Sequence, residues 1–420
     1  MELSDTNDAR IEPFLNTQRT TAEDFTATLA VHSTMNDSGG PSTKPLKLVI
    51  FRPNMAEGGA DRVTVTLLRH LDRNRFEPTL VLMRREGVLL PEIPEDVPVV
   101  DLQGWRLRSA WLSLARFLRE ASPDILFSMS SGGNPVASLA HLLSRSKSRL
   151  VLSRRNILNS RETDSAAGRA FAPLHRMLYR RADAVLAISK GVAEDLVSIL
   201  DVPPRLVSVV YNPLPEKLIG GTRSAAPPHP WFQERIPVLL ATGRLVEQKD
   251  YPTLLHAFAI VHRRTAVRLI VLGKGPLLEA LEDQCAELGI ADDVCFAGWV
   301  SDPTEYMRWC TVFVLSSQWE GLCTALLEAL GCGAAAVSTD CRAGPSELIT
   351  HGENGLLVPV GDPGALAESI LNLLENDELR NRFGENARLR ARQFSAPGIV
   401  ARYESSLLGA AGLRSEGADA

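Results

Sequence analysis

The sequence predicts an α/β protein made of two parallel-sheet domains in tandem, joined by an irregular linker. Three observations lead to this prediction. Short apolar runs suited to buried parallel strands alternate with helical patterns through residues 46–212. The alternation stops in the proline- and glycine-rich stretch 213–235 and resumes through residues 236–395. Alternating strands and helices favour right-handed crossovers, and therefore a parallel sheet in each half.

The expected strands leave room for a helix between most neighbours. In the first half they cover residues 46–51, 79–83, 124–127, 149–153, 184–189 and 206–210, with a first helix over 61–71. In the second half they cover residues 237–242, 268–272, 294–297, 312–315, 335–339 and 355–359. A last helix is expected near 399–408, inside a terminal segment 396–420. Residues 1–45 are polar and lack periodicity, so we expect a disordered tail there.

Composition limits the class of protein. The chain has 420 residues, of which 45% are hydrophobic, so it can build two cores. No window approaches the roughly 18 apolar residues of a membrane span, and the N-terminus lacks the apolar run of a secretory signal. The six cysteines are 9 to 15 residues apart without a C-x-x-C pair. We therefore expect a reduced, cytoplasmic protein without a zinc site.

The net charge of -5 is unevenly distributed. Residues 1–45 carry a net charge of -4, residues 46–212 carry +7, and residues 213–420, with 18 basic and 26 acidic side chains, carry -8. A basic first half suggests contact with an anionic partner. Ordinary drift in surface charge is the alternative explanation.

The segment 320–333 has the densest group of functional residue types, and it follows the expected strand 312–315. We expect Glu320 at the start of a helix and Glu328 eight residues on, just over two turns later, so that both carboxylates can share one face. A helix N-terminus offers backbone N–H groups to anions. The pattern suits a ligand with several hydroxyls and a phosphate, although a helix with a favourable N-terminal charge and one solvated glutamate remains an alternative.

Two further loops follow strands. Arg244 and Lys249 lie after the first strand of the second half, where parallel sheets bind ligands. Their short loop can bring both cations to one diphosphate and stabilise its leaving charge, unless both are solvated surface cations. Gly58 and Gly59 can let the backbone approach a phosphate, although a glycine pair is a weak signal.

The chain lacks a D-x-D triplet, so we expect neither a metal ion nor a cofactor.

Together these segments resemble glycosyltransferase family 4, the retaining glycosyltransferases of GT-B fold, in which two Rossmann-like domains face each other across a cleft. Glu320 and Glu328 resemble the family's E-x7-E signature. Residues 243–250 resemble its G-R-x4-K-D motif, and residues 352–359 its G-x-x-G-x-L strand. Residues 188–190 and 210–213 are similar to first-domain segments, so the match runs from about residue 46 to about residue 395.

The resemblance implies a role for each candidate residue. Glu320, Arg244 and Lys249 are the expected catalytic residues. The ribose of the nucleotide sugar is expected to contact Glu328, and its phosphate Gly58 and Gly59. The base is expected to contact the backbone near Val300. The sugar is expected to contact Glu320 and the backbone at Gly321, Leu322 and Cys323. Retention in this family is ascribed to front-face attack, with the leaving phosphate as the base.

One first-domain segment departs from the family's common pattern. Many members carry a histidine where this chain has residues 153–156, Ser-Arg-Arg-Asn. This run, like residues 338–347, resembles a subset that transfers N-acetylhexosamine-type sugars to lipid-linked oligosaccharides. We expect Arg155 and Asn156 to face the cleft on the acceptor side. Ala335 stands where the family often has proline, and this small apolar exchange should preserve binding.

We therefore expect a metal-independent, retaining transferase that moves a hexose or N-acetylhexosamine from a nucleotide diphosphate sugar, with uridine as the favoured base, to a glycan acceptor on a membrane lipid. A transferase for a small soluble acceptor and a non-catalytic sugar-nucleotide-binding paralogue are the alternatives. Residues 105–108 and Trp111 can help the basic domain dock on anionic lipid at the inner face of the cell membrane, or can form a solvated amphipathic helix. We expect no nucleic-acid partner. The lack of G-x-G-x-x-G argues against a dinucleotide dehydrogenase.

Overall fold

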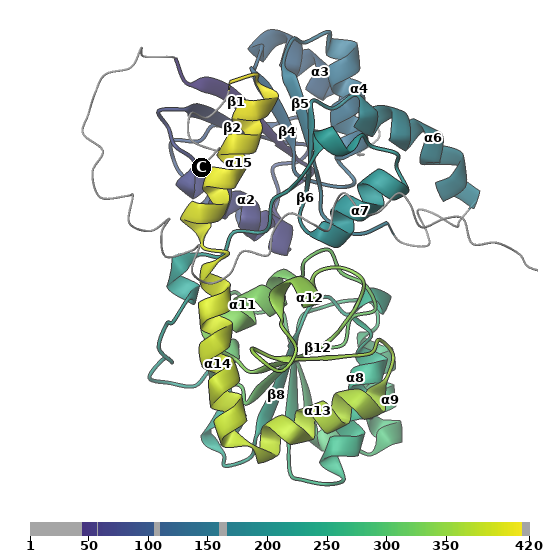
Figure 1. The fold of residues 1–420 in the computed structure, drawn as a ribbon, viewed down its shortest axis with the longest axis vertical. Coiled ribbons are helices and arrows are strands. Elements are labelled where there is room, and N and C mark those ends of the chain that lie inside the picture. The colour runs from purple at the N-terminus through teal and green to yellow at the C-terminus, as the bar shows by residue number, and fades with distance from the viewer. Residues whose placement is uncertain (1–43, 57, 105–109, 159–165, 414–420) are drawn as a thin grey trace, which may run out of the picture. The chain divides into compact units, whose positions relative to one another are not determined.

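The computed structural model describes residues 44–56, 58–104, 110–158 and 166–413. The described chain forms two parallel sheets, each flanked by helices (Figure 1). Nearly all of the expected tail 1–45, and the whole segment 105–108, lie outside the described residues. Trp111, which the sequence paired with that segment, is half-buried near the start of a helix.

The first sheet has seven strands among the described residues, in the order β3-β2-β1-β4-β5-β6-β7. They are β1 (Leu46–Arg52), β2 (Phe76–Leu82), β3 (Val99–Asp101), β4 (Ile125–Ser128), β5 (Arg149–Arg154), β6 (Ala184–Ala187) and β7 (Val207–Val209). The helices described between these strands are α2 (Gly59–His70), α3 (Ala110–Ala121), α4 (Asn134–Ser144), α6 (Ala166–Arg180) and α7 (Lys190–Ser198). Strand β3 was not expected, because its two valines directly follow a stretch with three prolines, which argues against a strand.

The second sheet has six strands within the described chain, in the order β10-β9-β8-β11-β12-β13. They are β8 (Val238–Thr242), β9 (Arg268–Leu272), β10 (Val294–Gly298), β11 (Val312–Leu315), β12 (Ala336–Thr339) and β13 (Leu356–Val358). Its helices are α8 (Tyr251–His262), α9 (Leu278–Leu288), α10 (Pro303–Trp309), α11 (Thr324–Cys332), α12 (Pro345–Leu348) and α13 (Pro363–Glu375).

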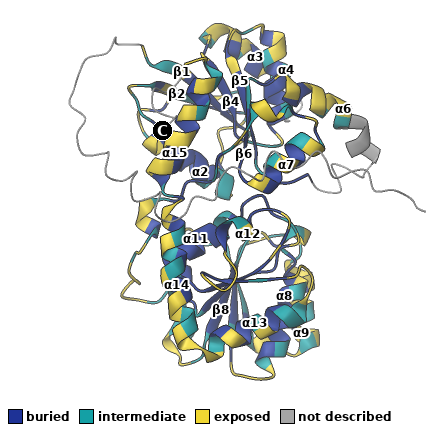
Figure 2. Cartoon of the chain, viewed as in Figure 1, coloured by how far each residue is buried: buried dark blue, intermediate teal, exposed yellow. Residues whose placement is uncertain are grey.

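The central strands of both sheets are almost completely buried and appear in dark blue in Figure 2, whereas the edge strands β3, β7 and β10 are only partly buried. All four residues of β4 and all four of β11 are buried. Helices cover both faces of a parallel sheet, so its strands have no solvent side and read as continuous apolar runs. This explains why the short runs in the sequence were sufficient to locate most strands.

The last helix returns to the first sheet. Helix α14 (Asp377–Arg392) packs on α11, and α15 (Ala396–Ala410) packs on α2, β5 and β6. Helix α15 begins three residues earlier than expected, because Pro397 lies in its first turn, where a missing N–H breaks no helical hydrogen bond. The chain's last helix therefore completes the first domain.

The linker 213–235 is irregular, as expected, apart from single turns at Glu216–Leu218 and Pro230–Gln233. Its start is tied to the α14–α15 junction. The Leu214 N–H donates to the Phe394 carbonyl at 2.7 Å, and the Ala396 N–H donates to the Leu214 carbonyl at 2.9 Å. The two segments that connect the domains are thereby held side by side.

Candidate active site

A cavity of about 760 Å³ lies where the carboxyl ends of β1, β5, β8 and β9 meet the first turn of α11. This is the edge at which parallel α/β sheets bind ligands. All twelve site residues expected from the sequence line this one cavity: Gly58, Gly59, Arg155, Asn156, Arg244, Lys249, Val300, Glu320, Gly321, Leu322, Cys323 and Glu328. The tertiary structure thus brings the motifs together, and what each residue binds stays a prediction.

Lys249 and Glu320 form a buried ion pair at the base of the cavity. The Lys249 ammonium donates to Glu320 Oε1 at 2.5 Å, and the Ser317 hydroxyl donates to the same oxygen at 2.8 Å. Burial lowers the pKa of Lys249, but the acidic groups of Cys323 and Glu320 beside it outweigh burial and raise that pKa above its ordinary value. The lysine therefore stays cationic at physiological pH, as a contact for phosphate requires.

The expectation that Glu320 and Glu328 share one helix face is wrong. Helix α11 begins only at Thr324, so Glu320 belongs to the loop after β11. Cys323 ends this loop with a φ of 63°, in the left-handed region, which interrupts a helical path between the two glutamates. A Cβ on Gly321 would lie 2.3 Å from the Arg155 carbonyl oxygen, so the loop needs glycine to pass beneath the first domain.

Glu328 approaches the cavity from within α11. Its residue is only 8% exposed, and burial raises the pKa of its carboxyl to about 7, with Arg62 opposing the rise and Asp302 adding to it. Arg62 comes from the first turn of α2 and donates to the Ser301 carbonyl at 2.6 Å, next to Val300. Sequence reasoning missed Arg62, although its position just after Gly58 and Gly59 is a signal that could have found it.

The glycine pair lies against the first turn of α11. A Cβ on Gly59 would lie 2.8 Å from the Thr324 hydroxyl oxygen, so only glycine allows this approach. The Gly58 N–H donates to Asp61 Oδ2 at 3.1 Å, and Asp61 also pairs with the buried Arg52. The buried carboxylate of Asp61 therefore holds the loop that carries the two glycines.

Arg155 lines the cavity, but its guanidinium is already bonded within the chain. It donates to the Asn212 amide oxygen at 2.7 Å and to the Tyr403 hydroxyl at 3.4 Å. Asn212 in turn donates to the Thr324 hydroxyl at 3.0 Å. Arg155 therefore links the end of β5 to α15 and, through Asn212, to the start of α11, while its buried Nε has no partner among the described residues. Its contact with the acceptor stays a prediction. The linker-side residue Asn212 supplies a contact that local sequence patterns could not reveal.

Two further cations lie at the cavity. Arg244 and Lys274 are exposed residues of the loops after β8 and β9. These loops pack closely, because a Cβ on Gly273, whose φ is 137°, would lie 2.0 Å from the Gly243 carbonyl oxygen. Lys274 belongs to a Gly-Lys-Gly segment that is a weak signal on its own. The cavity therefore joins buried and exposed positive charge.

The remaining sequence expectations concern metals, thiols and membranes. Within the described residues no group of three or more His, Cys, Asp or Glu side chains is placed to hold a metal ion. All six cysteines are free, as predicted, and burial raises the pKa of the Cys323 thiol to about 12. Among the described helices, none combines the length and the apolar character that crossing a bilayer requires.

Comparison with known proteins agrees with this architecture. Residues 57–218 match the family model described as Glycosyltransferase Family 4, and residues 228–390 match the model described as Glycosyl transferases group 1. The chain is 30% identical to an N-acetylgalactosamine-N,N'-diacetylbacillosaminyl-diphospho-undecaprenol 4-alpha-N-acetylgalactosaminyltransferase of Campylobacter jejuni, over 86% of this chain and 100% of that protein. A lipopolysaccharide core biosynthesis glycosyltransferase of Rhizobium meliloti is 36% identical over 40% of this chain and 48% of its own length.

Solved structures support the fold. An Anabaena protein in complex with UDP-glucose superposes with a TM-score of 0.74 at 21% identity, covering 86% of this chain and 100% of that one. A glycosyltransferase involved in lipopolysaccharide biosynthesis superposes with a TM-score of 0.71 at 15% identity, covering 86% and 100%. At these identities the likeness concerns the two-domain architecture alone.

Proposed function

This chain belongs to glycosyltransferase family 4, and from that premise we propose that it is a retaining, metal-independent transferase using a UDP-sugar donor. The proposed sugar is a hexose or N-acetylhexosamine, and the proposed acceptor is a lipid-linked glycan. The observation that carries the proposal is the single cavity that joins Lys249, Arg244, Glu320 and Glu328 at the start of α11. The Campylobacter relative, similar along its whole length, supports the sugar class and the acceptor by its name.

The proposed reaction depends on stabilising the charge of the departing diphosphate and uses no enzyme nucleophile. The bond between the sugar's anomeric carbon and the diphosphate oxygen breaks, and the acceptor hydroxyl oxygen bonds to that carbon on the same face. The hydroxyl proton passes to the departing phosphate oxygen. Lys249, Arg244 and the backbone N–H groups at the start of α11 would stabilise the departing diphosphate in a preorganised, partly buried site. Two such cations can perform the task that a divalent ion performs in other transferases.

Ribose and sugar recognition are assigned to the two glutamates. An ionised Glu328 can accept hydrogen bonds from vicinal ribose hydroxyls, and Glu320, fixed by Lys249 and Ser317, can accept from a sugar hydroxyl. Charged acceptors in a site of low exposure give the stronger hydrogen bonds. Arg62, held beside Ser301, would keep the first domain close to the donor.

The direct test is turnover with a panel of UDP-sugars and a polyprenyl diphosphate-linked glycan. We expect transfer of one hexose or N-acetylhexosamine, with the product's anomeric configuration, read by NMR, equal to the donor's. An inverted product would refute the retaining mechanism. Turnover only with a water-soluble acceptor would favour the soluble-acceptor alternative, and donor binding without any turnover would favour the non-catalytic one.

A lipid-linked acceptor requires contact with a membrane surface. Helices α4 and α6 pack against each other and carry exposed apolar side chains: Leu142, Leu143, Leu174 and Met177. Exposed cations follow α4 in the sequence at Arg145 and Lys147 and occur on α6 at Arg176. Apolar side chains flanked by cations suit an anionic lipid surface, so we assign membrane docking to α4 and α6.

Vesicle sedimentation tests this assignment. Wild type should sediment with phosphatidylglycerol vesicles and much less with phosphatidylcholine vesicles. The double change Leu174→Glu and Met177→Glu should weaken sedimentation, while the exposed Leu389→Glu on α14 serves as the control. Equal sedimentation of all three proteins would rule out α6 as the contact.

A further inference from the structure

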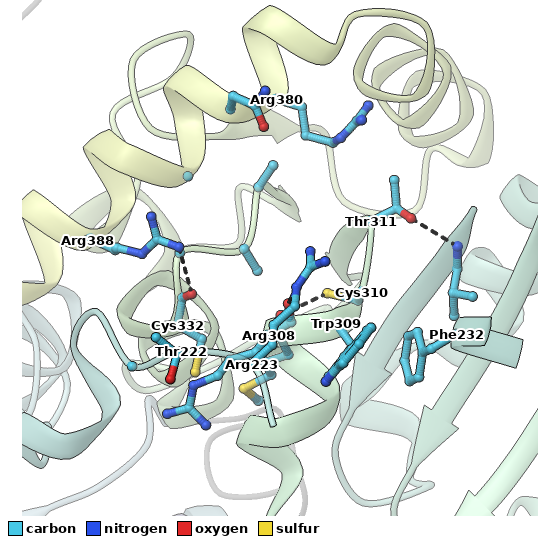
Figure 3. Close-up of a pocket in the computed structure, with 18 of the residues that line it drawn as sticks. Thr222, Arg223, Phe232, Arg308, Trp309, Cys310, Thr311, Cys332, Arg380 and Arg388 are labelled. Atoms are coloured by element: carbon cyan, nitrogen blue, oxygen red, sulfur yellow. Dashed lines mark hydrogen bonds between the residues drawn. The ribbon is translucent and has the colours of Figure 1, made fainter. Parts of the chain in front are cut away.

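A second cavity, of about 960 Å³, lies at the amino ends of the strands of the second sheet, opposite the carboxyl ends that border the active-site cavity (Figure 3). It is lined by Val238 at the start of β8, by Thr311 just before β11 and by Ala335 just before β12. The other walls come from linker residues 220–223, α10, the end of α11 and α14. None of its lining residues also lines the active-site cavity. Its volume is typical of small-molecule sites.

Four arginines line this cavity, although the half of the chain that builds it has a net charge of -8. They are Arg223, Arg308, Arg380 and Arg388, and Figure 3 shows them arranged around the hollow. The acidic side chains in the lining are Glu234 and Glu385. Glu234 is already paired with Arg268 at 2.8 Å. The lining of this cavity is therefore basic, although residues 213–420 as a whole are acidic.

The arginines differ in how far their charge is already compensated. Arg308 pairs with Glu305 at 2.8 Å, and Arg380 with Asp377 at 2.6 Å. Within the described chain neither Arg223 nor Arg388 forms an ion pair. Arg388 makes only a long contact, 3.5 Å, to the Cys332 carbonyl at the end of α11, and its buried Nε has no partner among the described residues.

Buried donors point to a missing acceptor. The Arg308 side chain is 8% exposed, and its Nε, like that of Arg388, has no hydrogen-bond partner in the described structure. Buried donors are ordinarily satisfied, so each such group needs an explanation. Arginine presents several donors in a planar fork that matches the oxygens of phosphate.

An aromatic wall adjoins the cations. The Arg223 guanidinium lies 5.2 Å from the centre of the Trp309 ring, and its Nε donates to the Arg308 carbonyl at 2.7 Å. This stacking and hydrogen bond hold Arg223 at the rim without neutralising it. Phe232 packs near Trp309, with ring centres 6.2 Å apart. The cavity thus offers fixed cations beside an apolar surface.

We propose that this cavity, which we call the arginine pocket, binds a phosphate-bearing small metabolite through Arg223, Arg308 and Arg388, with its organic part against Trp309 and Phe232. The site is separate from the donor's. Helix α11 places Thr324 at the active-site cavity and Cys332, eight residues later, at the arginine pocket, about 12 Å apart at 1.5 Å per residue. One diphosphate group cannot contact both ends.

Pyrophosphate, titrated calorimetrically at about 0.15 M salt, is the probe. It should occupy two sites on the wild-type chain, one in each cavity. UDP should displace pyrophosphate from the active-site cavity only. Arg388→Gln should remove or weaken the second site at least tenfold while leaving UDP affinity unchanged. Arg223→Gln provides an independent variant should Arg388→Gln lower the melting temperature.

Arg382→Gln is the matched control, because Arg382 is an exposed arginine of the same helix, α14, outside the pocket lining. It should bind pyrophosphate as wild type does. A single pyrophosphate site that persists unchanged in Arg388→Gln and Arg223→Gln would overturn the proposal. So would equal weakening by Arg382→Gln, since that would indicate general charge attraction. Failure of UDP to displace any pyrophosphate would count against the proposed donor and not against the arginine pocket.

Discussion

The ionisation of Glu328 should make donor binding depend on pH near neutrality. Burial raises the pKa of this carboxyl to about 7 in the protein without donor. Only the carboxylate accepts hydrogen bonds from both hydroxyls of a ribose, because the protonated acid must itself donate from one oxygen. A donor that binds through Glu328 will therefore prefer the ionised protein, and its affinity should fall as the pH falls.

The size of the effect follows from the pKa. With a value of about 7, the ionised fraction is about nine-tenths near pH 8 and about one-tenth near pH 6. If only the ionised form binds, the donor Kd rises about tenfold between these two conditions, which is about 1.4 kcal/mol. The diphosphate of a nucleotide sugar keeps its charge over this range, so the donor itself does not contribute.

The same pKa shift affects stability, with a definite sign. The folded-state pKa lies above the ordinary value of 4.5, so protonation favours the folded protein. The stabilisation of the folded protein by protonated Glu328 is fully present below about pH 4.5 and is lost as the pH rises through about 7. The loss amounts to about 3 kcal/mol at 1.36 kcal/mol per pH unit. Glu328→Gln should therefore melt at a higher temperature than wild type near pH 8.

Calorimetric titration of the donor from about pH 6 to about pH 8 tests whether donor affinity depends on pH and whether Glu328 causes that dependence. Wild type should show the tenfold change, and so should the control Glu353→Gln, which alters an exposed carboxylate of the same domain. Glu328→Gln should bind more weakly near pH 8, by roughly 1.5–3 kcal/mol, and independently of pH. A wild-type affinity that stays constant, or a pH dependence that survives in Glu328→Gln, would refute the reasoning.

Four other changes have expected outcomes. Lys249→Ala leaves Glu320 buried without its cation, which should cost about 3–5 kcal/mol of stability; an unchanged denaturation midpoint would show the pair to be unimportant. Arg155→Ala should lower the melting temperature and raise KM for both substrates, because Arg155 supports Asn212, whereas a change confined to the acceptor KM would support a direct acceptor contact. Turnover should survive EDTA, and loss of activity that magnesium or manganese restores would contradict the metal-independent mechanism. Deletion of residues 1–45 should leave the melting temperature unchanged, and a large drop would show that this segment packs on the rest of the chain.

The sequence alone determined the alternation of elements and twelve of the residues that line the active-site cavity. Parallel strands buried on both faces must be apolar along their whole length, so β4 and β11 were visible as short runs. The motifs that follow strands were visible as well, because a parallel sheet directs its carboxyl-end loops to one edge. For the same reason Arg244, Lys249, Glu320 and Glu328 could be expected at one site.

Tertiary structure decided the features that depend on residues far apart in the chain. Cys323 adopts a positive φ, and this separates Glu320 from the helix of Glu328 in a way that local propensity does not predict. The return of α15 to the first sheet supplies Tyr403 as a partner for Arg155, 248 positions away in sequence. Such contacts come from packing between elements, whereas periodicity in the sequence reports only which face of a single element is buried.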